Sequence, residues 1–143
     1  MNDHGAPAAL NGPSVSQRVA LARRGARARL QAAGIASADA EARLIVLHAA
    51  QAETSLVLLD QLPETFEADV EAILVRREKR EPLQLILGQA PFRHLTLETA
   101  RGVFIPRPET EVIAEWGASL LADATSNPPT ALDLGTGSGA IAL

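Results

Sequence analysis

The sequence contains no cysteine, which excludes a disulfide framework and thiolate metal sites. No apolar run approaches the roughly 18 residues that a membrane-spanning helix needs. The first residues, MNDHGAPAALNGPS, include an acid but neither a basic cluster nor an apolar core, so they do not have the pattern of a secretory signal. Basic residues are also not in excess, because 13 Lys and Arg against 17 Asp and Glu give a net charge of −4. These absences predict a cytoplasmic protein without a membrane segment and without a direct nucleic-acid partner.

Residues 14–88 show the periodicity of a helical bundle, after a flexible N-terminus at residues 1–13. Ser14 and Gln17 have the spacing of a capping box, and the apolar positions that follow them recur on one helical stripe. Gly34 is typical of the residue that ends such a helix. Further helices are predicted near residues 37–50, 55–60, 64–80 and 81–88.

The second of these helices is apolar on nearly every side, in the stretch ARLIVLHAAQ, and we expect it to be the buried centre of the bundle. His48 lies within it and is interpreted as a core histidine. In the helix at 64–80, the predicted inward positions are Phe66, Val70, Ile73 and Leu74.

After Gly88 the pattern changes. HLTLET alternates, and RGVFIP is a β-branched and aromatic run between glycine and proline, so residues 89–107 are predicted to be a β-hairpin linker. A helix is then expected to begin at Pro108, with Glu109 and Glu111 in its first turn. Its predicted inward residues are Ile113, Trp116 and Leu120.

The stretch LDLGTGSGAIAL, residues 132–143, has the form of a short buried strand, a glycine loop and the start of a helix. Glycines in such a loop let the backbone approach a ligand closely, and the helix would add free N–H donors. The spacing also satisfies G-x-G-x-x-[GA], the form typical of dinucleotide sites. Alone, the pattern leaves three readings open: a cofactor site for S-adenosylmethionine, a dinucleotide site, or a tight turn without a ligand.

Asp133 favours the first reading. An ionised carboxylate next to a pyrophosphate would be an unfavourable like-charge contact, whereas S-adenosylmethionine carries an ammonium and a sulfonium and no phosphate. The pattern D-x-G-x-G-x-G therefore favours the methyl donor.

Three stretches together, EPLQLILG, FIPRPETE and LDLGTGSGAIAL, resemble the release-factor glutamine methyltransferases, the PrmC/HemK family, in order and spacing. The resemblance implies an N-terminal all-α helical bundle for substrate recognition and then the hairpin linker. Residues 108–143 would then be the start of an α/β Rossmann-like class I methyltransferase domain. It also implies methyl transfer from S-adenosylmethionine to the glutamine side-chain amide of the Gly-Gly-Gln motif in class 1 peptide-chain release factors, by a monomer.

The same resemblance implies two groups of site residues. The cofactor would be lined by Asp133, Gly135, Thr136, Gly137, Ser138 and Gly139. The mouth of the site would hold Phe104, which could pack on the cofactor or substrate, with Arg107, Pro108 and Glu109; the alternative for this second group is a rigid helix start.

The chain departs from the family in lacking the downstream Asn-Pro-Pro-Tyr motif that holds the substrate amide. The similar string Asn127-Pro128-Pro129-Thr130 precedes the glycine loop and has no tyrosine, so we interpret it as unrelated. No catalytic residue is therefore assigned, and no metal site, because the histidines lack metal-ligand spacing. We expect a truncated polypeptide that is inactive alone and binds the methyl donor weakly or not at all. The alternatives are a helical binding module for a translation factor, a methyltransferase of another protein amide, and an NAD-type oxidoreductase.

The first helix carries five arginines and no acid. They flank its apolar stripe on both sides, which suggests either a contact surface for an acidic partner, such as the release factor, or a solvated helix face. The five are Arg18, Arg23, Arg24, Arg27 and Arg29.

Overall fold

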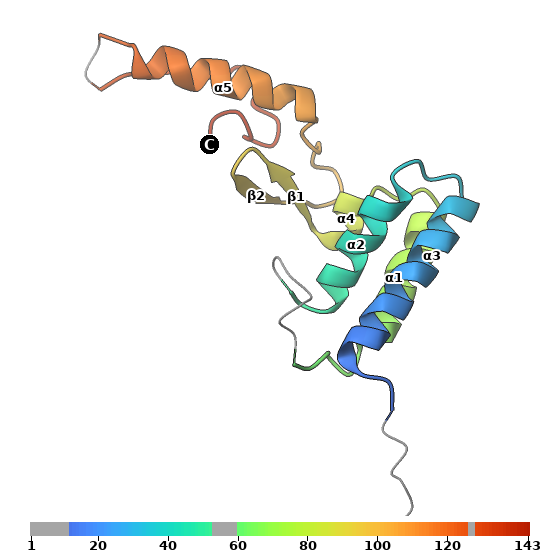
Figure 1. Ribbon diagram of the computed structural model, residues 1–143. Coiled ribbons are helices and arrows are strands. Elements are labelled where there is room, and N and C mark those ends of the chain that lie inside the picture. Colours follow the sequence, from blue (N-terminus) through green and yellow to red (C-terminus); the bar gives the residue numbers. More distant parts are fainter. Residues whose placement is uncertain (1–11, 53–59, 126–127) are drawn as a thin grey trace, which may run out of the picture. The chain divides into compact units, whose positions relative to one another are not determined.

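A computed structural model describes residues 12–52, 60–125 and 128–143 of the chain. The chain forms two compact units, one up to Glu81 and one from Pro82 onward (Figure 1). The first contains α1, α2 and α3, and the second contains α4, the strands β1 and β2, and α5. The short helix expected at 55–60 lies almost entirely outside the described residues.

Three helices pack on one another in the first unit: α1 (Val15–Ala32), α2 (Ala38–Ala49) and α3 (Phe66–Glu78). The predicted capping box begins α1, since the Gln17 backbone N–H donates to Ser14 Oγ at 3.3 Å and the Ser14 N–H donates to Gln17 Oε1 at 2.9 Å. Two orphan donors at the helix start are thereby satisfied. Gly34 follows the helix end at φ 69°, as predicted.

The core of this unit is the apolar side of each helix. The fully buried side chains include Leu30, Ile45, Val46 and Phe66, and the inward positions predicted for α3 are confirmed. The expectation that α2 is buried on nearly every side is wrong: Leu44 is 49% exposed, and His48 is exposed rather than in the core. These two residues lie one turn apart, on a side of α2 that neither of its neighbours α1 and α3 covers.

Four arginines of α1 reach acids on both neighbouring helices. Arg18 donates to Glu67 of α3 at 2.7 Å, and Arg29 donates to Glu78 of α3 at 2.7 Å and also to Glu71. On the other flank, Arg23 and Arg27 both face Asp39 of α2. Most of these arginines therefore hold helices together, a role that neither of the two sequence interpretations contained.

The second unit begins with α4 (Leu83–Leu87), which ends at Gly88 with φ 74°, where only glycine adopts the conformation easily. An antiparallel hairpin follows, of β1 (Gln89–Phe92) and β2 (Leu95–Glu98), with Phe92 opposite Leu95. Thr99 then ties the end of β2 to α4, because its N–H donates to Gly88 O at 2.9 Å and its Oγ1 donates to Gln84 O at 2.8 Å.

The hairpin is confirmed, but one of its predicted strands is wrong. The partner of LTLE is QAPF, and residues 101–106 form no strand. A proline such as Pro91 cannot donate to a ladder, yet each strand of a two-stranded ribbon has one edge without ladder bonds, where a proline is tolerated. The turn needs a positive φ, and Arg93 supplies it at 52°.

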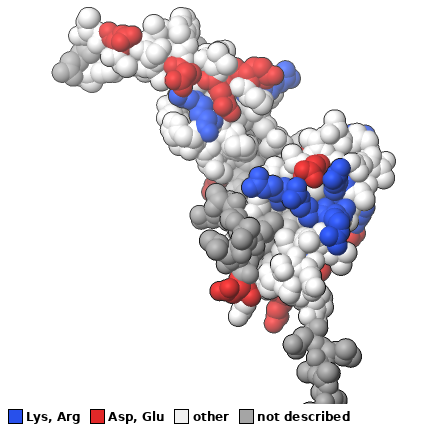
Figure 2. All heavy atoms as spheres, viewed as in Figure 1, with Lys and Arg blue, Asp and Glu red and all other residues white. Residues whose placement is uncertain are grey.

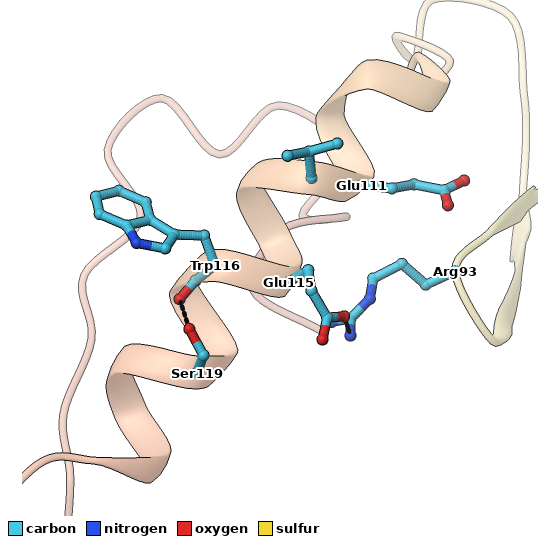
Figure 3. Close-up of a pocket in the computed structure, with 6 residues that line it drawn as sticks. Arg93, Glu111, Glu115, Trp116 and Ser119 are labelled. Carbon is cyan, nitrogen blue, oxygen red and sulfur yellow. Dashed lines mark hydrogen bonds and ion pairs between the residues drawn. The ribbon is translucent and has the colours of Figure 1, made fainter.

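Helix α5 (Pro108–Ala122) begins at the predicted proline, but its predicted inward face is wrong (Figure 3). Ile113, Trp116 and Leu120 are 56%, 66% and 52% exposed, whereas Ala114 is buried in a small cluster with Phe92 and Ala140. The helix is apolar on more than one side, so periodicity alone could not predict which side is buried. The buried side carries Ala114, whose small side chain allows close packing against neighbouring residues.

Residues 131–134 were expected to form a buried strand, and they do not. Within the described residues the hairpin is the single sheet, and a strand is stable only when a second strand supplies its ladder of hydrogen bonds. The helical region and the hairpin are confirmed, and the Rossmann-like start stays a prediction.

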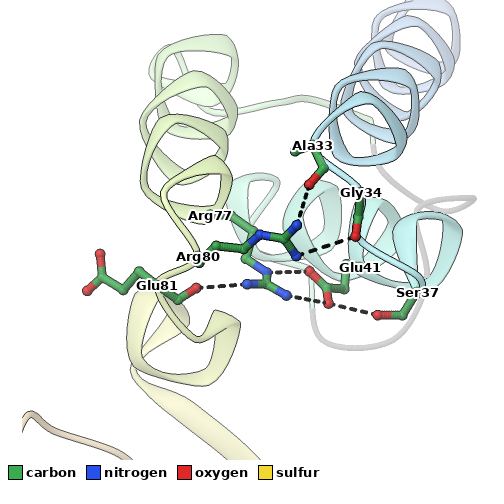
Figure 4. Close-up of polar contacts among 7 residues, drawn as sticks. All are labelled: Ala33, Gly34, Ser37, Glu41, Arg77, Arg80 and Glu81. Carbon is green, nitrogen blue, oxygen red and sulfur yellow. Dashed lines mark hydrogen bonds and ion pairs between the residues drawn. The ribbon is translucent and has the colours of Figure 1, made fainter.

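A polar network joins the end of α1, the start of α2 and the end of α3 (Figure 4). Arg77 donates to both Glu41 oxygens, at 2.7 and 3.1 Å, and to the Glu81 carbonyl at 3.2 Å. Ser37 Oγ donates to Glu41 at 2.8 Å. Arg80 donates to the Ala33 carbonyl at 2.7 Å, which satisfies a backbone acceptor at the end of α1.

Three carboxyl groups of this unit have lowered pKa values. Burial alone would raise the pKa of Glu41, but the hydrogen bonds from Arg77 and Ser37 outweigh it and the net direction is down. The hydrogen bonds from Arg18 and Arg29 lower the pKa of Glu67 and Glu78, respectively. All three groups therefore favour the ionised form in the folded protein.

Because these carboxyls titrate below their ordinary pKa of 4.5, the unfolded chain binds more protons than the folded chain at acidic pH. Their stabilisation is complete above about pH 5 and is lost as the pH falls through and below about 4.5. Urea unfolding followed by circular dichroism should show this loss between pH 5 and pH 3. Glu41→Gln should flatten the pH dependence, and Glu64→Gln, at an exposed acid outside the network, should leave it unchanged. A stability that is constant over this range would contradict the role of the ion pairs.

Two leucines of α1 test the packing. Leu30 is 0% exposed and Leu21 is 65% exposed. Leu30→Ala should lower the free energy of unfolding by about 2–5 kcal/mol, since it leaves a cavity, and Leu21→Ala should change it by less than ~0.5 kcal/mol. Equal effects in urea unfolding would show that α1 does not pack on its Leu30 side.

Candidate functional site

The glycine loop lies in the second unit, after α5. Gly135, Gly137 and Gly139 all have a positive φ, at 76°, 56° and 78°. A Cβ at Gly135 would meet no atom within 4 Å, so the requirement for glycine here comes from the backbone conformation and not from crowding. The loop therefore presents backbone with open space in front of it.

The helix start expected after the loop is not formed. The Gly139 N–H donates to Thr136 O at 2.8 Å and the Ala142 N–H donates to Gly139 O at 3.1 Å, which makes two successive turns. The N–H donors of a helix start are therefore not available here, and the loop offers turns instead.

Asp133 has a buried carboxylate oxygen, Oδ2, with no hydrogen-bond partner among the described residues. A buried carboxylate oxygen without a donor is costly, and in native structures such an atom calls for an explanation such as a bound group. The sequence had singled out this residue for its charge, and the structure adds that one of its oxygens lacks a partner. A cationic group with N–H donors fits this oxygen.

The glycine loop and the segment that precedes α5 line the same cavity, which has a volume of about 170 Å³. Phe104 and Pro106 line it from that segment, and Ser138 lines it from the loop. Its other described lining residues are Leu97, Glu98, Thr99, Val103 and Leu143. Two residues predicted for the site, Phe104 and Ser138, thus share a cavity, and the end of β2 contributes a wall that sequence reasoning could not have placed there.

The other predicted residues of the mouth lie elsewhere. Arg107 is the residue before α5, with an extended backbone, and Pro108 and Glu109 form the first turn; all three are exposed, and none lines the cavity. Their positions fit the alternative reading, a rigid helix start, in which the proline pre-sets φ and the carboxylate complements the helix dipole.

A second depression, of about 640 Å³, lies along the exposed side of α5 and was not foreseen from the sequence (Figure 3). Val112 and Trp116 give it an apolar floor, and the ion pair between Arg93 of the hairpin turn and Glu115 closes one side. Trp116 had been assigned to the core. The apolar residues on more than one side of α5 were the available signal.

Other kinds of site find no support in the described part of the chain. No group of three or more His, Asp or Glu side chains there lies close enough to hold a metal ion. Among the same residues, no helix combines the length and the hydropathy that crossing a bilayer requires.

Comparison with known proteins bears on both units. Residues 22–88 match the PrmC N-terminal domain. This segment covers most of α1, all of α2, α3 and α4, and ends at Gly88.

Relatives align over most of the chain. It is 46% identical over 122 residues to the release factor glutamine methyltransferase of Corynebacterium glutamicum, covering 83% of this chain and 42% of that protein. Proteins of the same name from Bifidobacterium longum and Streptomyces coelicolor are 43% and 42% identical, over 82% and 80% of this chain and 42% and 41% of their own lengths. The chain thus spans about two fifths of the length of these relatives.

The match at residues 22–88 and the alignments to three enzymes agree with the resemblance inferred from the motifs. Residues 22–88 belong to the PrmC N-terminal domain family, and the chain is related to the N-terminal portion of the release factor glutamine methyltransferases.

Proposed function

We propose that this polypeptide contributes to methyl transfer from S-adenosylmethionine to the side-chain amide nitrogen of the glutamine in the Gly-Gly-Gln motif of class 1 peptide-chain release factors. The helical region, residues 14–88, would recognise the substrate, and the loop after α5 would hold part of the methyl donor. The names of the relatives support the reaction class. The observation that carries the cofactor assignment is the partnerless buried oxygen of Asp133.

S-adenosylmethionine fits the residues around the loop. Its ammonium would donate to the Asp133 carboxylate, and a negative charge there opposes a pyrophosphate, which argues against the oxidoreductase alternative. Gly135, Gly137 and Gly139 would let the backbone at Thr136 and Ser138 lie against the ligand, because their positive φ keeps the loop tightly turned.

Phe104 is 66% exposed and lines the cavity that Ser138 also lines. An aromatic ring at this position could cover a bound cofactor or substrate and limit its contact with water. Arg107, Pro108 and Glu109 would then act indirectly, by fixing the start of α5 and with it the segment that carries Phe104.

The chemistry asks for positioning more than for acid–base catalysis. An amide nitrogen is a poor nucleophile because its lone pair is delocalised into the carbonyl, and S-adenosylmethionine, when bound, supplies a methyl group already activated by the sulfonium. The residues of this chain would orient the donor, and holding two reactants in line can lower a barrier by several kcal/mol, roughly 7–11 in the best cases. We assign no residue here to the substrate amide.

Charge removal at Asp133 tests the cofactor site. In an NMR titration with S-adenosylmethionine, the amide signals of the glycine loop should shift, and Asp133→Asn should weaken binding roughly three- to tenfold because the ammonium loses its counter-charge. Asp123→Asn removes the same charge from the end of α5 and should leave binding unchanged. Titration with NAD should move none of these signals. Equal weakening by both variants, or shifts with NAD alone, would contradict the assignment.

A chimera tests the reaction and the substrate. The corresponding N-terminal portion of the Corynebacterium glutamicum enzyme is replaced by this chain, and transfer of a labelled methyl group to a class 1 release factor is measured. The chimera should label the glutamine of the Gly-Gly-Gln motif, and Asp133→Asn should lower kcat/KM for S-adenosylmethionine roughly three- to tenfold, as it lowers binding.

The control for the chimera is a release factor with Gln→Ala in that motif, which should take up no label. A folded chimera that binds S-adenosylmethionine but labels nothing would contradict the proposed substrate. A folded chimera that labels a different protein amide would favour the alternative methyltransferase.

A further inference from the structure

Four exposed arginines belong to α1 and α2, beside the ion pairs that join these two helices. Arg23, Arg24 and Arg27 belong to α1, and Arg43 belongs to α2. We call these four residues the arginine surface. Figure 2 shows basic side chains gathered on this face of the first unit, with little acidic surface among them.

The charge of the arginine surface is not balanced among the residues that the structure describes. Arg23 approaches Asp39 at 3.1 Å and Arg27 approaches the same residue at 3.8 Å, so two guanidiniums share one carboxylate. Arg43 is one turn after Asp39 on α2, within reach of the same carboxylate. Neither Arg24 nor Arg43 makes an ion pair with the described residues. Four positive groups against one negative group leave an excess of three positive charges.

The opposite flank of α1 shows what a balanced surface looks like here. There Arg18 and Arg29 face three acids of α3 and make short hydrogen bonds with all of them. Stabilisation of the bundle thus accounts for the charges on that flank. It accounts for only part of the charge on the arginine surface, where the repulsion between like charges is not relieved by the fold.

We infer that the arginine surface is a docking site for an acidic segment of a protein partner, one that presents at least three carboxylates. Arg23 and Arg27 are one helical turn apart, about 5–6 Å between Cβ atoms, which matches carboxylates one turn apart on a partner helix. The guanidinium fork pairs with carboxylates through two parallel hydrogen bonds, and all four residues are arginine rather than lysine.

A protein partner fits better than a nucleic acid. The sequence up to Glu81 has 10 Lys and Arg against 11 Asp and Glu, so the attraction is local and lacks the long-range positive field of nucleic-acid-binding domains. Neither α1 nor α2 contains Phe, Tyr or Trp, so the arginine surface has no aromatic platform for base stacking. This inference does not depend on the proposed methyl transfer.

The test uses the full chain and two fluorescein-labelled probes in low salt, read by fluorescence anisotropy. The first probe is a twelve-residue peptide with Glu at every third or fourth position, paired with the same peptide carrying Gln in place of Glu. The second is a twelve-base-pair RNA duplex. The Glu peptide should bind, the Gln peptide should not, and binding should weaken as salt is raised to 0.5 M.

Charge reversal locates the contact. Arg24→Glu and Arg43→Glu should each weaken binding of the Glu peptide roughly tenfold, because neither side chain is needed for an ion pair in the folded bundle. Lys79→Glu is the matched control, since it makes the same charge change at an exposed residue at the end of α3 and should have little effect. Circular dichroism should show unchanged helicity for all three variants.

Three outcomes would overturn the inference. The first is equal weakening by Lys79→Glu, which would show attraction to the chain as a whole. The second is tighter binding of the RNA duplex, lost with the same arginines, which would assign the arginine surface to nucleic acid. The third is no binding of the Glu peptide even in low salt.

Discussion

The arrangement of the first unit depends on the ion pairs that α1 makes with both of its neighbouring helices, α2 and α3. Its apolar stripe is narrow, with the small side chain of Ala26 beside Leu30, so hydrophobic burial alone gives the helix little orientational preference. The arginines beside the stripe supply that preference, because Arg29 has its acids on α3 and Arg23 has its acid on α2. Rotation of α1 about its axis would break ion pairs on both flanks. Orientation is thus set by charge, and cohesion by the core.

The second unit has the opposite character. Its small buried cluster joins Phe92 of the hairpin, Ala114 of α5 and Ala140, and the glycine loop before Ala140 forms turns and no strand. Its chemical content lies in a few positions: glycines with positive φ, the partnerless oxygen of Asp133, and a cavity that Phe104 shares with Ser138. The chemistry proposed for this loop thus depends on groups that lack partners, whereas the helices of the first unit are stabilised by a buried core and by ion pairs.

Sequence reasoning succeeded where the signal was local. The capping box at Ser14, the stop at Gly88 and the inward face of α3 are each encoded within a few residues, and the structure shows all three. It failed where the outcome depends on distant partners. Trp116 has apolar neighbours on its own helix, but the exposure of its side chain depends on which other segments pack on that helix. Residues 131–134 have the composition of a strand, but a strand forms only when a second strand pairs with it. The cavity beside Ser138 joins segments some forty residues apart, which no motif records.

The reciprocal bonds between Ser14 and Gln17 have a further consequence. They cap the first turn of α1 with groups of Ser14 and Gln17 alone, so no residue before Ser14 is needed to cap the helix. Whatever is fused ahead of this point, such as an affinity tag, a fluorophore or another domain, should leave the bundle undisturbed. The protein thus has a natural attachment point for immobilisation or labelling.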